Sequence, residues 1–123
     1  MPHVPLDKYE DLFLQIAYDT ENIAVYAFVN FLINQNESAD THNVAASLLI
    51  HPFGYIDGAY GAALHHVRRS IELAPTDVSF KELILFFALT PYELITDEEA
   101  VTCAKQILAL DPTNKAALDF LQK

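Results

Sequence analysis

The chain has 123 residues, of which 52% are apolar and 20% charged, and these proportions predict a globular domain rather than a disordered segment. Its 17 Asp and Glu against 7 Lys and Arg give a formal net charge of −10 at pH 7. This balance argues against a phosphate-binding surface for nucleic acid, disfavours binding to an anionic membrane, and favours a basic protein partner.

The N-terminal part predicts a helical hairpin, because its apolar residues recur at helical spacing and strict alternation is missing. A first helix is expected from Asp7 to about Tyr18, opened by the capping-box sequence Asp7-Lys8-Tyr9-Glu10. A second helix over residues 21–35, capped by Asp19 or Thr20, is apolar nearly all round and is therefore expected to be central. The expected inward side chains of the first helix are Leu12, Ile16 and Phe13.

The middle of the chain predicts two helices that flank an irregular segment. The third helix covers about residues 41–51 and stops before Pro52, whose ring disfavours helix in the preceding residue. Residues 51–58 are irregular and contain two of the three glycines. The fourth helix, about residues 58–74, has an apolar stripe, and its opposite face carries His65, Arg68, Arg69 and Glu72.

The C-terminal part predicts three more helices, so the whole chain is expected to be all-α with about seven. The fifth, residues 77–89, is too apolar to have a wide solvent-facing side. Two capping boxes follow it: the one at Thr90 predicts a single turn, and the one at Thr96 opens a helix that ends near Leu110. A short last helix covers about residues 114–122.

A repeat links the last two thirds of the chain, because the sequence from Leu73 to Asp77 recurs from Leu110 to Asn114, 37 residues later. Helical pairs that recur at such a spacing indicate hairpins that bury their faces on one another. These residues resemble the tetratricopeptide repeat family over about residues 42–123. The matching positions are Gly58, Tyr60, Ala63, Ser70 and Leu73-Ala-Pro75, and again Ala100 and Leu110-Asp-Pro112.

The resemblance implies a short right-handed solenoid of helical hairpins within a single domain, residues 1–123, whose function is protein binding. An N-terminal hairpin (1–36) would precede two repeat hairpins (41–74 and 77–110) and a capping helix (113–123). More loosely, the small, acidic chain resembles bacterial immunity proteins that block toxins.

The expected location is the cytoplasm, and no membrane association is expected. A single cysteine, Cys103, leaves no second thiol for an internal disulfide, and the N-terminal residues lack the pattern of a removable secretion signal. The longest apolar run, residues 23–33, is about half of the ~20 residues that a membrane span needs.

The sequence offers little for catalysis, and we expect no cofactor, no metal and no enzymatic activity. His65 and His66 diverge by about 100° on a helix, and no spacing typical of zinc sites is present. His66 is expected at a helix surface or half-buried, and Cys103 as a small buried apolar residue. The acids from Asp97 to Glu99 fit a helix N-terminus, where carboxylates interact favourably with the helix dipole.

Charge is unevenly distributed, because residues 9–67 contain seven acidic residues and no Lys or Arg. An electrostatic field of one sign speeds the encounter with an oppositely charged partner. Ordinary solubility explains this charge distribution equally well. The aromatic residues of the 51–58 segment either form a binding hot spot with an acidic rim or anchor the segment in the core. The candidate partner-binding residues are Glu37, Asp40, Phe53, Tyr55 and Asp57.

The function expected from these observations is non-catalytic binding of a basic protein partner, in the manner of an immunity or inhibitor protein. One alternative is a peptide-binding adaptor with tetratricopeptide repeats, for which Arg68, Arg69, Lys81 and Lys105 are the nearby cations. Another is a small-ligand or enzymatic pocket among the histidines and tyrosines. The oligomeric state stays open, and self-association through apolar helices is a further possibility.

Overall fold

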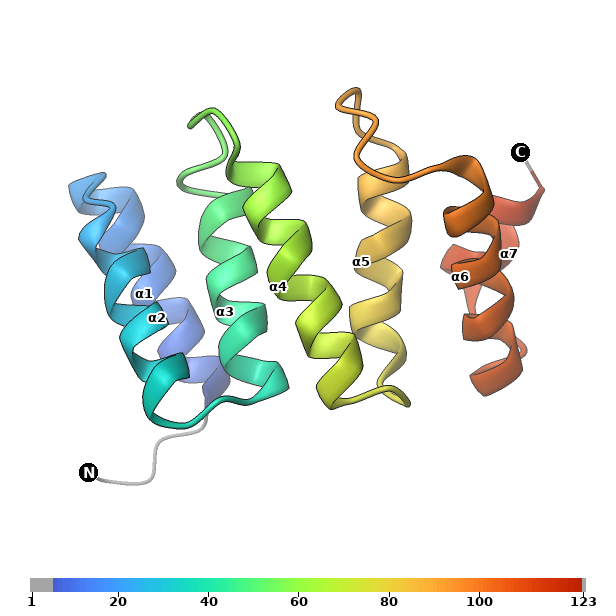
Figure 1. Ribbon diagram of the computed structural model, residues 1–123, viewed down its shortest axis with the longest axis horizontal. Coiled ribbons are helices and arrows are strands. Elements are labelled where there is room, and N and C mark those ends of the chain that lie inside the picture. The colour runs from blue at the N-terminus through green and yellow to red at the C-terminus, as the bar shows by residue number, and fades with distance from the viewer. Residues whose placement is uncertain (1–5, 123) are drawn as a thin grey trace. The chain divides into compact units, whose positions relative to one another are not determined.

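The computed structural model describes the backbone of residues 6–122 and the side chains of residues 10–122, and it confirms the all-α fold with seven helices (Figure 1). The predicted capping box at Asp7 lies outside the described side chains. The helices are α1 (Leu6–Thr20), α2 (Ala24–Gln35), α3 (Ala39–Ile50), α4 (Ala59–Leu73), α5 (Val78–Ala88), α6 (Asp97–Leu110) and α7 (Lys115–Leu121).

The chain divides between Leu73 and Ala74 into two compact units. Unit 1 contains α1 to α4, and unit 2 contains α5 to α7. The stacking of hairpins into a right-handed solenoid stays a prediction, as does a single domain.

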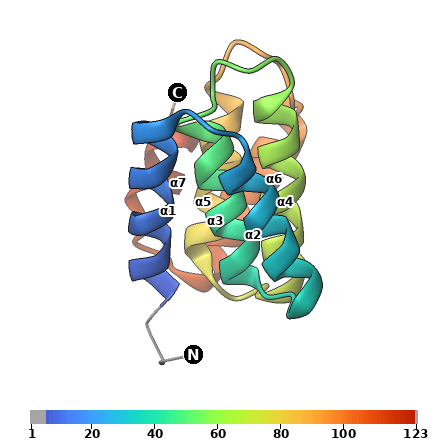
Figure 2. The same ribbon diagram turned by 90° about the vertical axis from the view of Figure 1, so that its left-hand side faces the viewer.

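Helix α3 is the centre of unit 1, since it packs against α1, α2 and α4. Figure 2 shows α1 and α2 side by side in front of α3. Small residues allow these helices to approach closely, and Ala17, Ala45 and Ala63 are fully buried. The core of α1, α2 and α3 is built from Ala17, Val29, Ile33, Val44, Ala45, Leu48 and Phe53.

The predicted inward face of the first helix is wrong for two residues. Leu12 and Ile16 are exposed, whereas Phe13 packs on the core and Ala17 is buried. Helix α1 has apolar residues on two sides, so its periodicity is compatible with two orientations. The side with Ala17 is buried because a small residue there lets α1 approach α3 closely.

The prediction that residues 21–35 form a central helix is also wrong. Val29 and Ile33 of α2 are buried, but Phe28 and Phe31 are about half exposed, at 50% and 54%. The helix begins at Ala24, whose N–H donates to Oδ1 of Asn22 over 2.9 Å. The apolar residues of α2 therefore lie on two faces of the helix, of which one packs in the core and the other is exposed to solvent.

The segment between α3 and α4 is anchored by Phe53, which is completely buried and whose N–H donates to the carbonyl of Leu48 over 3.0 Å. Gly54 follows where the chain passes the end of α3, and a Cβ there would lie 2.5 Å from the carbonyl oxygen of Ile50. Gly58 has a φ of +84°, a conformation that glycine adopts at little cost.

In unit 2, α6 packs against both α5 and α7, and α5 packs against α7. Asp77, Thr96 and Asn114 cap the three helices, each accepting a hydrogen bond from a backbone N–H of the first turn. The cap at Thr96 confirms the prediction from the sequence. Residues 90–95 form a non-helical connection, in which the Thr90 hydroxyl donates to the carbonyl of Phe87 over 2.9 Å.

Candidate functional site

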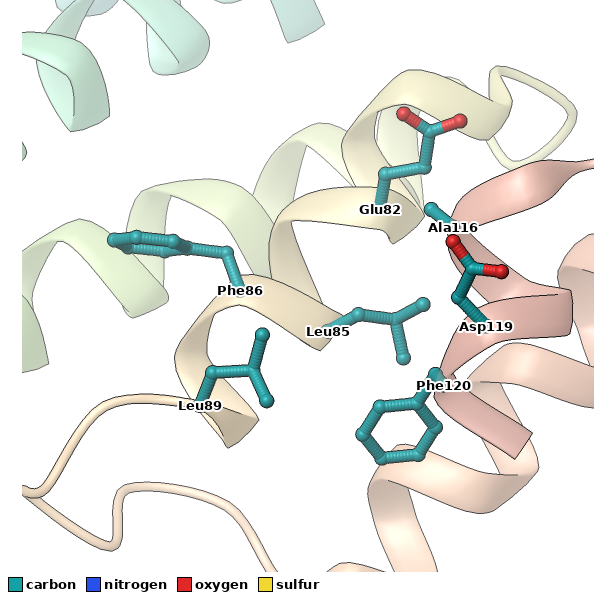
Figure 3. Close-up of a pocket in the computed structure, with 7 residues that line it drawn as sticks. All are labelled: Glu82, Leu85, Phe86, Leu89, Ala116, Asp119 and Phe120. Carbon is teal, nitrogen blue, oxygen red and sulfur yellow. The ribbon is translucent and has the colours of Figure 1, made fainter. Parts of the chain in front are cut away.

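The main candidate site is an apolar groove in unit 2 with a volume of about 240 Å³, between α5 and α7 (Figure 3). Both helices line it with residues at helical spacing, so each presents one continuous face. The lining residues are Glu82, Leu85 and Phe86 from α5, Leu89 directly after its end, and Ala116, Asp119 and Phe120 from α7.

The polar groups of the groove are two carboxylates at its Ala116 end (Figure 3). Glu82 accepts a hydrogen bond from Nδ2 of the buried Asn114 over 2.7 Å. The Oδ1 of Asn114 also caps α7 by accepting from the N–H of Ala117 over 3.0 Å. One side chain thus fixes the start of α7 and orients Glu82, while Asp119 lies on the exposed side of α7.

The groove suits a partner segment in which an apolar side chain is followed by a positively charged one. Its volume is below the roughly 300–1,000 Å³ of typical small-molecule pockets. Its lining contains no histidine, cysteine, serine or lysine that could act as a nucleophile or base. Sequence analysis missed this site, because an apolar stripe on the fifth helix indicates burial and only the pairing with α7 leaves part of it open.

The structure places the five sequence-predicted residues in different surroundings in unit 1. Phe53 is buried in the core, so it anchors its segment, whereas Tyr55 is 69% exposed. Asp40 lies in the first turn of α3 and Asp57 beyond its last turn, at opposite ends of a helix about 18 Å long. These residues therefore do not form one patch.

Glu37 is already paired within unit 1. Its two oxygens accept hydrogen bonds from Nε and Nη2 of Arg69 over 2.9 and 2.8 Å, and from Nε2 of His42 over 2.7 Å. Hydrogen bonds from Arg69 and then His42 lower the pKa of Glu37 to about 2. Arg69 also donates to Glu72, and its hydrogen bonds to Glu37 and then Glu72 raise the pKa of Arg69. A basic partner would have to compete with Arg69 for this carboxylate.

A chain of hydrogen bonds extends from Glu37 into unit 1 and links α2, α3 and α4. Nδ1 of His42 lies 2.8 Å from Nδ1 of His66, and Nε2 of His66 lies 2.8 Å from the Tyr26 hydroxyl. His42 and His66 are both buried, each 5% exposed. The prediction of a surface or half-buried position for His66 is therefore wrong, because these partners satisfy its ring inside the unit.

The carboxylate at the end of this chain determines the direction of the first hydrogen bond. Ionised Glu37 only accepts, so Nε2 of His42 donates to it. The contact between the two Nδ1 atoms and the contact of His66 Nε2 with the Tyr26 hydroxyl continue the chain, and in each contact one atom donates and the other accepts. If both rings were charged, two N–H groups would face each other at 2.8 Å, so the pair holds at most one extra proton.

Burial lowers the pKa of His66 to about 4, with smaller contributions from His42 and His65. His66 is therefore neutral at pH 7. The hydrogen-bond network of His66 connects α2, α3 and α4. Among the described residues, no group of three or more His, Cys, Asp or Glu could hold a metal ion.

Cys103 is buried in unit 2, as predicted, and its Sγ donates to the carbonyl of Lys81 over 3.3 Å. Burial raises the pKa of the thiol. A buried thiol that stays protonated is a poor nucleophile, so Cys103 has a packing role. Asp97, Glu98 and Glu99 occupy the first turn of α6, the position predicted for them.

Across residues 6–122, none of the helices combines the length and the apolar character needed to cross a membrane. No protein-family model, curated protein or solved structure matches this chain.

Proposed function

We propose that this protein is a non-catalytic protein-interaction module, and that a basic partner segment binds in the α5–α7 groove. The observation that carries the proposal is the groove itself, with an apolar floor and the carboxylates of Glu82 and Asp119 at one end. An apolar side chain of the partner would fill the groove, and a neighbouring Lys or Arg would lie against the carboxylates.

The net charge of −10 supports this proposal, because it attracts a basic partner over a distance. Exposed acidic residues such as Asp40 and Asp57 would contribute to the electrostatic field of the protein without contacting the bound segment. Attraction of this kind is screened by salt, so association should slow as ionic strength rises.

The more specific form of the proposal is an immunity or inhibitor protein whose partner is a toxin with a basic site. An adaptor that clamps the C-terminal carboxylate of a peptide is less consistent with the groove, because its lining has two carboxylates and no Lys or Arg. Location in the cytoplasm is part of the same proposal.

The test begins with affinity capture from the native cells at low salt and elution at high salt, followed by binding measurements with the purified partner. The double variant Glu82→Gln/Asp119→Asn should raise the Kd at least tenfold, as expected for removal of two charges at an interface. The matched control Asp40→Asn/Asp57→Asn removes the same charge from unit 1 and should change the Kd less than about threefold.

The opposite pattern would refute the proposal. If the control variant lost binding and the groove variant kept it, the partner would bind unit 1 instead. A captured partner that is acidic, or binding that does not depend on salt, would also contradict the electrostatic argument.

A further inference from the structure

The outer face of the α1–α2 hairpin is apolar and exposed, opposite the face that packs on α3. Leu12, Phe28 and Phe31 are between 50% and 54% exposed, and Ile16 is 38% exposed. The aromatic rings run continuously across the hairpin: Phe13 meets Phe28 edge to face at 5.8 Å, and Phe28 stacks with Phe31 at 6.3 Å. Grouped, half-exposed aromatic side chains of this kind indicate an interaction surface.

The face differs in charge from the rest of the protein. Among the described helices, only α2 has no charged residue. A basic partner would find no carboxylate along it. A second copy of the chain, however, would bring no like charges together along α2, although each copy carries −10 and the exposed Asp11 and Asp19 lie beside Leu12 and Ile16 on α1. Charge therefore favours a second copy as the occupant of this face.

The outer stripe of α2 is complementary to itself. Ala24, Ala27, Phe28 and Phe31 follow one another at i, i+3, i+4 and i+7, so they share one side of the helix. When two such helices pack antiparallel about a two-fold axis between positions 27 and 28, Ala24 lies opposite Phe31 of the second copy. Ala27 then lies opposite Phe28, so each large side chain meets a small one.

The area of the face is sufficient for a weak dimer. With about 200 Å² for a fully exposed large apolar side chain, the four exposed residues present roughly 390 Å² per copy. If homodimer interfaces are about 65% apolar, the total buried area is roughly 1,200 Å². This lies just above the ~1,000 Å² expected of a specific interface and at the low end of the range, where weak and transient complexes are found.

We propose that the protein forms a two-fold symmetric homodimer through the outer faces of α1 and α2, with the two α2 helices antiparallel. Leu12 and Ile16 of α1 extend the interface beside the α2 contact. The proposal is independent of the groove in unit 2 and holds whether or not that groove binds a partner.

Sedimentation equilibrium of the full chain, from low micromolar to millimolar concentration, tests the proposal. The weight-average mass should rise from 13.8 kDa towards twice that value. Phe31→Glu should keep the mass at 13.8 kDa, because it places two carboxylates in the apolar interface. The matched control Leu89→Glu changes an exposed leucine of unit 2 and should dimerise like the wild type, while losing binding of a groove partner.

A size swap tests the antiparallel register. Phe31→Ala alone should weaken the dimer at least tenfold, since it leaves Ala24 opposite another alanine. The double variant Ala24→Phe/Phe31→Ala exchanges large and small residues and should restore dimerisation. Circular dichroism confirms that each variant is folded. A wild-type chain that stays monomeric, a dimer unaffected by Phe31→Glu, or a swap that fails to restore dimerisation overturns the proposal.

Discussion

Acidification should destabilise unit 1 through His66. In the folded chain burial lowers the pKa of His66 to about 4, whereas 6.5 is its ordinary value. Below pH 6.5 the unfolded chain therefore binds a proton that the folded chain does not, and the free energy of unfolding falls as the pH falls. The slope is at most about 1.4 kcal/mol per pH unit, so the loss between pH 7 and pH 5 is roughly 2 kcal/mol.

Glu37 does not obscure this effect, because its pKa is lowered from 4.5 to about 2. The stability that its ionisation contributes is present above pH 4.5 and is lost only as the pH falls from 4.5 towards 2. The window between pH 7 and pH 5 therefore reports on His66, whose ring meets His42, His65 and Tyr26.

Urea denaturation at a series of pH values, followed by circular dichroism, measures the slope. His66→Asn removes the titrating ring and should flatten the pH dependence over this window, even if the variant is less stable throughout. His65→Asn is the matched control, because His65 is the exposed neighbour on the same helix, and it should keep the slope. Equal slopes in the wild type and His66→Asn would refute the reasoning, as would an NMR titration in which His66 gains its proton near pH 6.5.

Three further predictions concern stability and are checked by thermal or urea unfolding. Phe53→Ala should cost about 3–5 kcal/mol because it empties the core, whereas Tyr55→Ala should stay within about 0.5 kcal/mol; similar costs would contradict the assigned burial. Thr96→Ala should cost about 1 kcal/mol by removing the cap of α6, and Thr96→Ser should retain most of that stability. Gly54→Ala should destabilise because its Cβ would meet the Ile50 carbonyl, while Gly61→Ala, in open space within α4, should stabilise by about 0.5–1 kcal/mol; a reversed order would refute the local geometry.

The helices could be predicted from the sequence because their determinants are local. Apolar spacing, prolines and capping residues act within a few residues, so the cap at Thr96 and the end of α3 before Pro52 follow directly from neighbouring side chains. The burial of Cys103 was predictable for the same reason, since it lies on the apolar stripe of its helix.

The orientation of the N-terminal helices was decided by tertiary packing. Both sides of α1 are apolar, and only contact with α3 buries Ala17 and leaves Leu12 in solvent. The packing of α2 on α3 leaves Phe28 exposed, although the composition of α2 alone predicts a central helix.

The candidate groove and the buried histidine pair join residues far apart in the chain, which is why spacing did not predict them. His42 and His66 form one buried pair with Glu37 and Tyr26, and Glu82 meets Asn114, which caps the next helix but one. The sequence by itself determined which segments are helical and the sign of the charge. Only tertiary structure decided which carboxylates are paired and which apolar faces stay open, because both depend on which helices pack together.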